Sequence, residues 1–203
     1  LKGHSASVYS VTISPDGKYI VSGSYDHTIK IWDIKTAECL NTLEGHSYSV
    51  HSVTISPDGK YIVSGSRDKT IKIWDIKTAE CLNTLEGHLD FVSSVTITPD
   101  GKYIVSGSED KTIKIWDIKT GECLNTLEGI SGFIRSIAIS PDGKYIVSGS
   151  NDDTIKVWDL KTGECLNTSK GHSKWVNSIA ISPDGKYIIV SGSDDKTIKV
   201  SDF

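Results

Sequence analysis

The chain has 203 residues, with 22 basic and 26 acidic side chains and a formal net charge of −4. Its lysines and aspartates are spread evenly, which argues against a surface that tracks nucleic-acid phosphates, and no apolar run approaches the roughly 20 residues of a membrane-spanning helix. We therefore expect a soluble protein with no nucleic-acid or membrane partner. The chain begins at Leu1 and contains no Met, so we expect a fragment or a processed chain.

An internal repeat organises the sequence. The string SPDGKYIVSGSRDKTIKIWD at Ser56–Asp75 recurs along the chain, and Trp32, Trp74, Trp116 and Trp158 follow one another at intervals of 42 residues. A fixed period in this range is typical of architectures in which neighbouring units bury each other's apolar faces. We expect one domain over residues 1–203, and we divide it into the repeats 1–42, 43–84, 85–126, 127–168 and 169–203.

Four short strands are predicted in the first repeat. They cover Val8–Ser14, Tyr19–Ser24, Thr28–Asp33 and Glu38–Leu43. The turn at 15–17 reads Pro-Asp-Gly, in which Pro presets φ and Gly accepts positive φ. No helical periodicity appears in any repeat. Each unit therefore reads as one four-stranded antiparallel blade of an all-β propeller.

These residues resemble those of the WD-repeat family. Gly3-His4 stands near the start of the unit, Asp26 lies in its second turn, and Trp32-Asp33 ends its third strand. The resemblance covers the whole chain in five consecutive copies. It implies a β-propeller of four-stranded blades, the last of which lacks its own fourth strand.

The resemblance also implies a hydrogen-bonded tetrad of His, Ser, Asp and Trp in each repeat. By position, its members are His4, Ser22, Asp26, Trp32, His46, Ser64, Asp68, Trp74, His88, Ser106, Asp110, Trp116, Ser148, Asp152, Trp158, His172, Ser191 and Asp195. Ile130 replaces the His of the fourth repeat and Ser201 replaces the Trp of the fifth. A lost partner in a buried network costs free energy, so we expect these two blades to be the least stable.

The tetrads are expected to be structural. A catalytic Ser-His-Asp triad is needed once and beside an oxyanion hole, whereas this constellation is repeated in every intact unit. No metal-ligand cluster or phosphate-binding loop stands out from the repeat. We expect no catalytic residue, no metal, no cofactor and no enzymatic activity.

Two local features carry expectations of their own. Cys39, Cys81, Cys123 and Cys165 are equivalent residues one repeat apart, too far apart for disulfides, so we expect small buried residues of a strand. Free cysteines favour a cytoplasmic location. The fifth repeat has an extra residue in Ile188-Ile189-Val190, and we expect a β-bulge near Ile188 or Ile189 to absorb it.

The number of repeats leaves three alternatives open. WD-repeat rings typically have seven blades, so five would leave two blade faces and strand edges uncovered. The units could close as a strained five-bladed ring, two copies could associate through their open ends, or the chain could be part of a longer protein. We favour self-association of the isolated chain.

A few positions differ in almost every repeat, whereas the framework around them is nearly constant. They lie in the loop entering the first strand and in the turn between the second and third strands, which open at the same end of a WD-repeat propeller. A fixed framework with varied aromatic and charged residues is the layout of a recognition surface; drift at exposed loop positions is the alternative. The expected partner-binding residues, called the loop face below, are Tyr9, Tyr25, Tyr48, His51, Arg67, Asp90, Phe91, Glu109, Phe133, Arg135, Lys174, Trp175 and Asn177.

The predicted function is a non-enzymatic scaffold that holds a protein or peptide partner on the loop face, free or as the sensor part of a longer signalling chain. The first alternative is a lectin-like or small-molecule-binding propeller with an equivalent pocket in each blade. The second is an engineered or recently amplified repeat segment without a natural ligand.

Overall fold

The computed structural model describes residues 1–183 and 189–202, which form nineteen strands in five antiparallel sheets. We call each sheet a blade. Blade 1 comprises β1 (Val8–Ile13), β2 (Tyr19–Ser24), β3 (Ile29–Asp33) and β4 (Cys39–Leu43); blade 2 comprises β5 (Val50–Ile55), β6 (Tyr61–Ser66), β7 (Ile71–Asp75) and β8 (Cys81–Leu85). Blade 3 comprises β9 (Val92–Ile97), β10 (Tyr103–Ser108), β11 (Ile113–Asp117) and β12 (Cys123–Leu127); blade 4 comprises β13 (Ile134–Ile139), β14 (Tyr145–Ser150), β15 (Ile155–Asp159) and β16 (Cys165–Ser169). Blade 5 comprises β17 (Val176–Ile181), β18 (Ile189–Ser193) and β19 (Ile198–Ser201).

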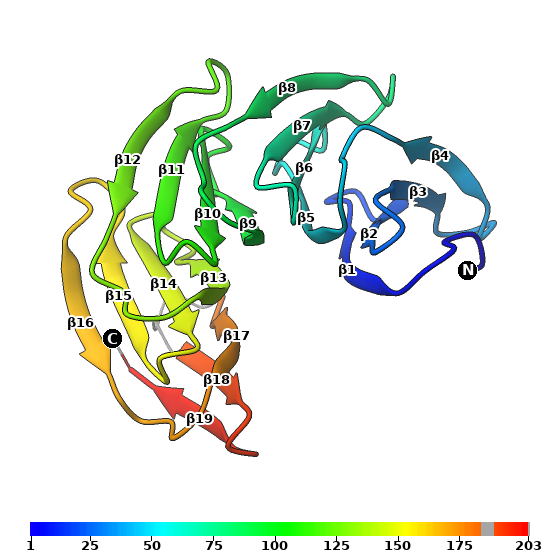
Figure 1. Ribbon diagram of the computed structural model, residues 1–203. Helices are drawn as coiled ribbons and strands as arrows, with labels where there is room; N and C mark the ends of the chain where they lie inside the picture. The colour runs from blue at the N-terminus through cyan, green and yellow to red at the C-terminus, as the bar shows by residue number, and fades with distance from the viewer. Residues whose placement is uncertain (184–188, 203) are drawn as a thin grey trace.

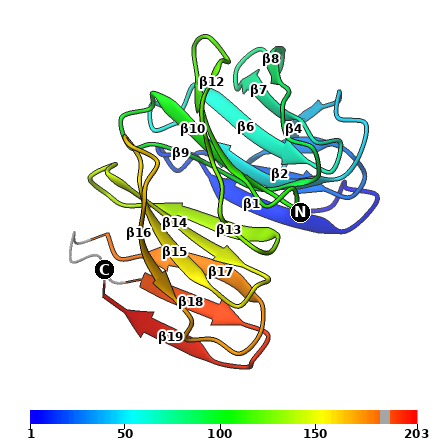
Figure 2. The same ribbon diagram turned by 60° about the vertical axis from the view of Figure 1, so that its left-hand side comes forward.

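The blades are arranged side by side in an open arc. Within each blade the strands pair in chain order, and the first strands β1, β5, β9, β13 and β17 contact one another from blade to blade. Blades 1 and 5 lie at opposite ends of the arc and do not meet (Figure 1); the turned view shows the same separation of the two ends (Figure 2). The all-β prediction of WD-type blades with a three-stranded last blade is confirmed, and the five blades do not close into a ring.

Strand direction places the connecting segments at two ends of the stack. Because the strands of a blade are antiparallel and consecutive, the loop before the first strand and the turn between the second and third strands lie at the same end, here called the upper end. The turn between the first and second strands and the loop before the fourth strand lie at the lower end. All loop-face residues therefore lie at or next to the upper end.

The hydrophobic core lies between blades. Ile29 and Ile31 of blade 1 pack in one buried cluster with Val53 and Trp74 of blade 2. Equivalent clusters join blade 2 to blade 3, blade 3 to blade 4 and blade 4 to blade 5. Each blade thus has two different apolar faces, one for the blade before it and one for the blade after it.

One apolar face at each end of the arc is left uncovered. The leading face, on blade 1, contains Val8, Val11 and Ile13, all of which are exposed. A cavity of about 500 Å³ on this face is lined in part by Leu1, Val8, Val11, Ile20 and Trp32. The trailing face, on blade 5, contains the exposed Val190, Ile198 and Val200.

The expectation of buried cysteines is wrong. Cys39, Cys81, Cys123 and Cys165 are all exposed and unpaired, because each begins the outermost strand of its blade, where no neighbouring strand covers it. Each thiol contacts a carbonyl of its own strand, such as that of Asn41, 3.5 Å from Cys39 Sγ. Equivalent thiols stand in four different blades.

The insertion in the fifth repeat lies largely outside the described residues. Ile188 is among residues 184–188, for which nothing is described. From Ile189 onward the register of blade 5 matches that of the other blades: Ile189 pairs with Ile181 as Ile62 pairs with Ile55. The pairing is regular from Ile189 onward, and the predicted bulge near Ile188 or Ile189 otherwise falls outside the described residues.

Candidate functional site

The predicted tetrad residues are joined by hydrogen bonds in the first three blades. In blade 2, His46 Nδ1 lies 2.7 Å from Asp68 Oδ2 and His46 Nε2 lies 2.7 Å from Ser64 Oγ. The indole N–H of Trp74 donates to the same Ser64 hydroxyl at 2.9 Å. Blades 1 and 3 repeat this arrangement within 0.1 Å. Each network connects the loop before the first strand to the turn between the second and third strands.

Hydrogen bonding keeps the tetrad carboxylates ionised. Burial alone would raise the pKa of Asp68, but hydrogen bonds from His46 and Thr70 outweigh it and hold this pKa well below its ordinary value. Asp110 is held in the same way by His88 and Thr112. The charge is a fixed part of the loop architecture.

Blades 4 and 5 keep parts of the network. In blade 4, Ile130 is buried in the core cluster, Trp158 still donates to Ser148 at 3.0 Å, and the Asp152 carboxylate accepts from the backbone N–H of Ser131. In blade 5, His172 lies 2.8 Å from both Asp195 and Ser191. Blades 4 and 5 thus each lack one tetrad residue and keep other hydrogen bonds of the network.

A β-bulge lies at the upper end of the first strand in every blade. In blade 2 the pairing of β5 with β6 passes from Val50↔Ser66 to Ser52↔Gly65, which leaves His51 without a partner. The equivalent unpaired residues are Tyr9, Ser93, Arg135 and Asn177. This is one of the columns that vary between repeats. A bulge changes the direction of its extra side chain. The variable residue of each blade is therefore the one that has no partner on the second strand.

The backbone holds two further variable columns side by side. In blade 2 the N–H of Arg67 donates to the carbonyl of Ser49 at 2.9 Å, and in blade 3 the N–H of Glu109 donates to the carbonyl of Phe91 at 2.9 Å. The equivalent bond in blade 5 runs from Asp194 to Trp175 at 3.1 Å. The turn between the second and third strands is thereby fixed against the loop before the first.

Contacts between loop-face side chains run across the blade boundaries. The Tyr9 ring of blade 1 stacks on the His51 ring of blade 2 with centroids 4.5 Å apart, and within blade 1 the Tyr25 ring meets Tyr9 edge-on. Arg67 of blade 2 lies over the ring of Phe91 of blade 3, its Cζ 4.3 Å from the centroid. Together with the contacts below, these join all five blades into one surface.

Arg135 links three blades. Its Cζ lies 4.8 Å from the ring centroid of Trp175 in blade 5, and its Nη1 lies 4.0 Å from Glu109 Oε1 in blade 3. Its Nε is buried and has no hydrogen-bond partner. Among the described residues, no other buried side-chain nitrogen or oxygen lacks one. Burial lowers the pKa of His51, and the positive charges of Arg67 and Arg135 lower it further, so both guanidinium groups act on this imidazole.

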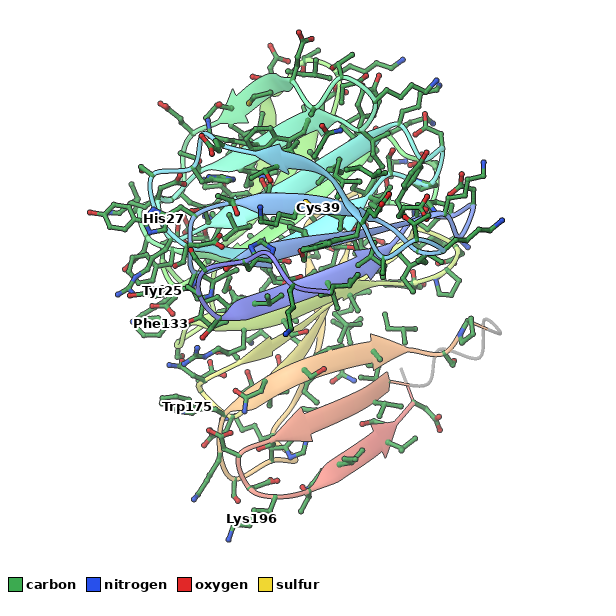
Figure 3. All side chains as sticks on the ribbon, turned by 90° about the vertical axis from the view of Figure 1, so that its right-hand side faces the viewer. Tyr25, His27, Cys39, Phe133, Trp175 and Lys196 are labelled. Carbon is green, nitrogen blue, oxygen red and sulfur yellow. The ribbon has the colours of Figure 1, made fainter. Side chains whose placement is uncertain are left out.

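Other loop-face residues make only local contacts. Asn177 donates to Asp194 within blade 5, the Asp90 carboxylate accepts from the backbone N–H of Phe91, and the N–H of Phe133 donates to Asn151. Lys174 is exposed at the tip of its loop. Figure 3 shows Tyr25, His27, Phe133 and Trp175 along the same edge of the molecule.

The predicted residue set missed part of this surface. His27, which lies 6.0 Å from the Tyr48 ring, and its equivalents Lys69, Lys111, Asp153 and Lys196 all adopt positive φ of 69–72°. A left-handed backbone is unfavourable for residues other than glycine. The string Ser-Gly-Ser-x-Asp-x-Thr marks this turn in the sequence. The residue just before its Thr belongs to the same surface.

The lower end carries a second kind of feature, a groove between blades. One groove of about 650 Å³ lies between blades 2 and 3 and is lined in part by Asp58, Tyr61, Leu82 and Lys119. An equivalent groove of about 620 Å³ lies between blades 1 and 2 and is lined in part by Asp16, Tyr19, Leu40 and Lys77. Unlike the loop face, the grooves repeat nearly the same residues.

Within residues 1–183 and 189–202, no three His, Cys, Asp or Glu side chains form a group that could hold a metal ion. No helix long and apolar enough to cross a membrane occurs in the same part of the chain.

Comparison with known proteins gives a family match over nearly the whole chain. The family described as "WD domain, G-beta repeat" matches residues 1–33, 37–75, 79–117, 121–159 and 163–202. Among curated proteins, the "Ribosome biogenesis protein BOP1 homolog" of Drosophila grimshawi is 54% identical over 43 residues, which is 21% of this chain and 6% of that protein. The protein of the same name from Aedes aegypti is 50% identical over 42 residues, 21% of this chain and 5% of its own length. These alignments are about one repeat long.

Proposed function

Because the chain belongs to the WD domain, G-beta repeat family, we propose that it is a non-enzymatic scaffold that binds a protein or peptide partner on the loop face. Family membership supports a protein-interaction role in general terms. The relatives' name refers to ribosome biogenesis, but a match of one repeat supports only the repeat itself. The unpaired cysteines favour a cytoplasmic location.

The observation that carries this proposal is the coincidence of the bulge with a variable column. Sheet pairing constrains the neighbours of Tyr9, His51, Ser93, Arg135 and Asn177, whereas these five residues have no partner in the register of the sheet and lie near the upper end of the first strands. Stacking and cation–π contacts then tie several of them to the adjacent blade. Residues that drifted freely would not need such contacts, and rigid aromatic and Arg side chains are the usual anchors of protein interfaces.

Backbone strain supports the same reading. Lys69 and Lys111 hold φ of 72° and 69°, where glycine would be favoured. Non-glycine residues in this conformation cost about 1–3 kcal/mol each. At the lower end the positive-φ residues before the fourth strands are only Ala37, Ala79, Gly121 and Gly163. Among the described residues, long side chains at strained positions are therefore particular to the upper end, and they are more consistent with a use at the surface than with stability.

A displayed random-peptide library tests the proposal. We expect selected peptides to protect backbone amides of residues 46–51, 88–93 and 130–135 from hydrogen exchange, since these segments carry the loop face. Protection confined to the turns at 57–60 and 99–102 would instead locate binding at the lower end and contradict the proposal.

That second outcome would favour a ligand-binding propeller, the alternative supported by the two equivalent grooves. A small-molecule or glycan ligand of this kind would bind at several equivalent sites per chain. Titration calorimetry would then give a stoichiometry well above one, whereas a loop-face partner gives one site per arc.

We further propose that the isolated chain self-associates through the leading and trailing faces. Val8, Val11 and Ile13 are equivalent to the buried Val50, Val53 and Ile55, and Ile198 and Val200 are equivalent to the buried Ile29 and Ile31. An exposed apolar surface of this extent favours association. Light scattering on a sizing column over a range of concentrations tests it; a single monomeric species throughout would overturn it.

A further inference from the structure

The chain contains two arginines, Arg67 and Arg135, and both lie on the loop face. Apart from histidines, the other basic residues of the chain are all lysines. Arginine differs from lysine in its planar fork of N–H donors, which matches a carboxylate in a bidentate geometry. Its use at these two positions is therefore a feature of the loop face.

Each arginine packs against an aromatic ring of the next blade. Arg67 lies over Phe91 and Arg135 lies over Trp175, and these two aromatic residues occupy the same position of their repeats. A ring beneath one face of the guanidinium leaves the N–H edge free to donate. Stacking also orders the arginine side chain before a ligand binds, so that binding costs less side-chain entropy.

Neither guanidinium is neutralised by a hydrogen-bonded carboxylate. Arg67 is exposed, and no hydrogen bond or ion pair joins its guanidinium to another of the described residues. Arg135 has Glu109 at 4.0 Å, the outer limit of an ion pair, and its Nε is buried without a hydrogen-bond partner. An unpaired buried donor is unfavourable, so an acceptor that reached Nε would gain this bond.

The surroundings carry charges of both signs. Asp90, Glu109 and Asp194 place three carboxylates at the upper end, beside Arg67, Arg135 and the lysines Lys69, Lys111, Lys174 and Lys196. A densely charged ligand such as a nucleic acid would meet carboxylates as well as cations there. One or two separate negative groups in an otherwise uncharged segment fit this mixed distribution better.

We infer that the loop face binds a peptide segment through an acidic side chain, Asp or Glu, whose carboxylate pairs with Arg67 or Arg135 beside an aromatic ring. This inference rests on the proposed function, because it names the chemistry of the partner on the same face. Tyr9 and Tyr48, both half-exposed, offer apolar contact to the neighbouring residues of the segment.

The two arginines allow a direct test by NMR. In protein labelled with ¹⁵N-arginine, the two side-chain Nε–H signals are assigned from the variants Arg67→Lys and Arg135→Lys, each of which removes one signal. We expect at least one of them to shift on titration with N-acetyl-glutamate amide and not with N-acetyl-glutamine amide. Equal shifts with both probes, or none with either up to the solubility limit, would overturn the inference.

Peptides from the displayed library provide the second arm. We expect Asp→Asn or Glu→Gln in a selected peptide, and at least one of Arg67→Gln and Arg135→Gln in the protein, to weaken binding about tenfold, the loss that accompanies one charged hydrogen bond. Lys77→Gln, at an exposed lysine of the lower end, is the matched control and should have no effect.

The outcomes separate this inference from the proposed function. If Trp175→Ala weakens peptide binding but Arg67→Gln, Arg135→Gln and neutralisation of the peptide do not, the loop face binds peptides without pairing with a carboxylate, and only the inference fails. If no loop-face variant changes binding, both fail.

Discussion

Val11 and Val53 hold the same position in successive repeats, yet Val11 is 66% exposed and Val53 is 5% exposed. The difference is the presence of a preceding blade, because Val53 packs in one cluster with Val21 and Ile31 of blade 1. At the other end of the arc, Ile198 is 75% exposed and its equivalent Ile29 is fully buried. The leading and trailing faces are therefore the two halves of the interface that joins neighbouring blades.

Complementary end faces predict head-to-tail pairing. A charge in an apolar interface is strongly unfavourable, so Val11→Asp and Val200→Asp should each block one face and stop further association. An equimolar mixture of the two variants should form a one-to-one complex, because each supplies the face that the other retains. Light scattering on the single variants and on the mixture measures this.

The matched control is Leu82→Asp, at an exposed residue of an outer strand, which should leave association unchanged. If the faces paired like with like, Val200→Asp alone would still dimerise through its leading face, and the mixture would show nothing new.

Glycines of the second strands report on the same interface. A Cβ on Gly107 would lie 2.4 Å from Ile134 Cγ2 of the next blade, whereas a Cβ on Gly192 would meet nothing within 4 Å. Gly107→Ala should therefore destabilise the fold by about 1–3 kcal/mol through overpacking. Gly192→Ala should leave the stability of the monomer nearly unchanged and weaken association, because its methyl group would meet Val8 of the second copy.

Urea unfolding gives the two stabilities, and the mass in solution gives the association. Equal destabilisation by both substitutions, or undisturbed association of Gly192→Ala, would contradict the head-to-tail arrangement.

Loss of a tetrad histidine should reduce stability. His88 is buried and bridges Asp110 and Ser106, so His88→Ala leaves two groups without their partner and should lower the free energy of unfolding by about 1–3 kcal/mol. The control is His27→Asn, because His27 is exposed and Asn tolerates its positive φ of 72°. Equal unfolding midpoints for the two variants would show that the network adds nothing to stability.

Acid should destabilise the fold through the tetrad aspartates. Burial opposes ionisation of Asp26, Asp68 and Asp110, but hydrogen bonds from Thr and His residues hold the pKa of each well below the ordinary value of 3.8. As the pH falls, the unfolded chain binds protons first, so this contribution is complete above about pH 4 and is lost as the pH falls toward the folded-state pKa. Urea titrations at a series of pH values should show the decline, with a shallower slope for Asp68→Asn. Identical slopes would contradict it.

Much of the fold follows from sequence, because the spacing of the repeats, the Pro-Asp-Gly turn and the alternation in Val8–Ile13 each specify one element. The exposure of the cysteines does not follow from sequence. Cys39 resembles an apolar strand residue, but it lies on the outermost strand of its blade, which no other strand covers. The openness of the arc likewise depends on the angle between blades, which no single repeat encodes.

The candidate site divides in the same way. The variation between repeats indicates the columns that contain His51 and Arg67, but not their arrangement. The bulge at His51 depends on pairing with β6, and the contact of Arg67 with Phe91 depends on the next blade. Sequence position therefore predicts membership of the surface, whereas packing between blades determines which side chains meet.

The most direct test of binding on the loop face compares the affinity of one library-selected peptide for the wild-type chain, Trp175→Ala and Leu82→Ala, measured by titration calorimetry. Trp175 is an exposed loop-face residue, and Leu82 is exposed in a groove of the lower end. We predict about tenfold weaker binding by Trp175→Ala, as expected for an aromatic anchor, and unchanged binding by Leu82→Ala. The reverse result would contradict this prediction and assign binding to the grooves between blades.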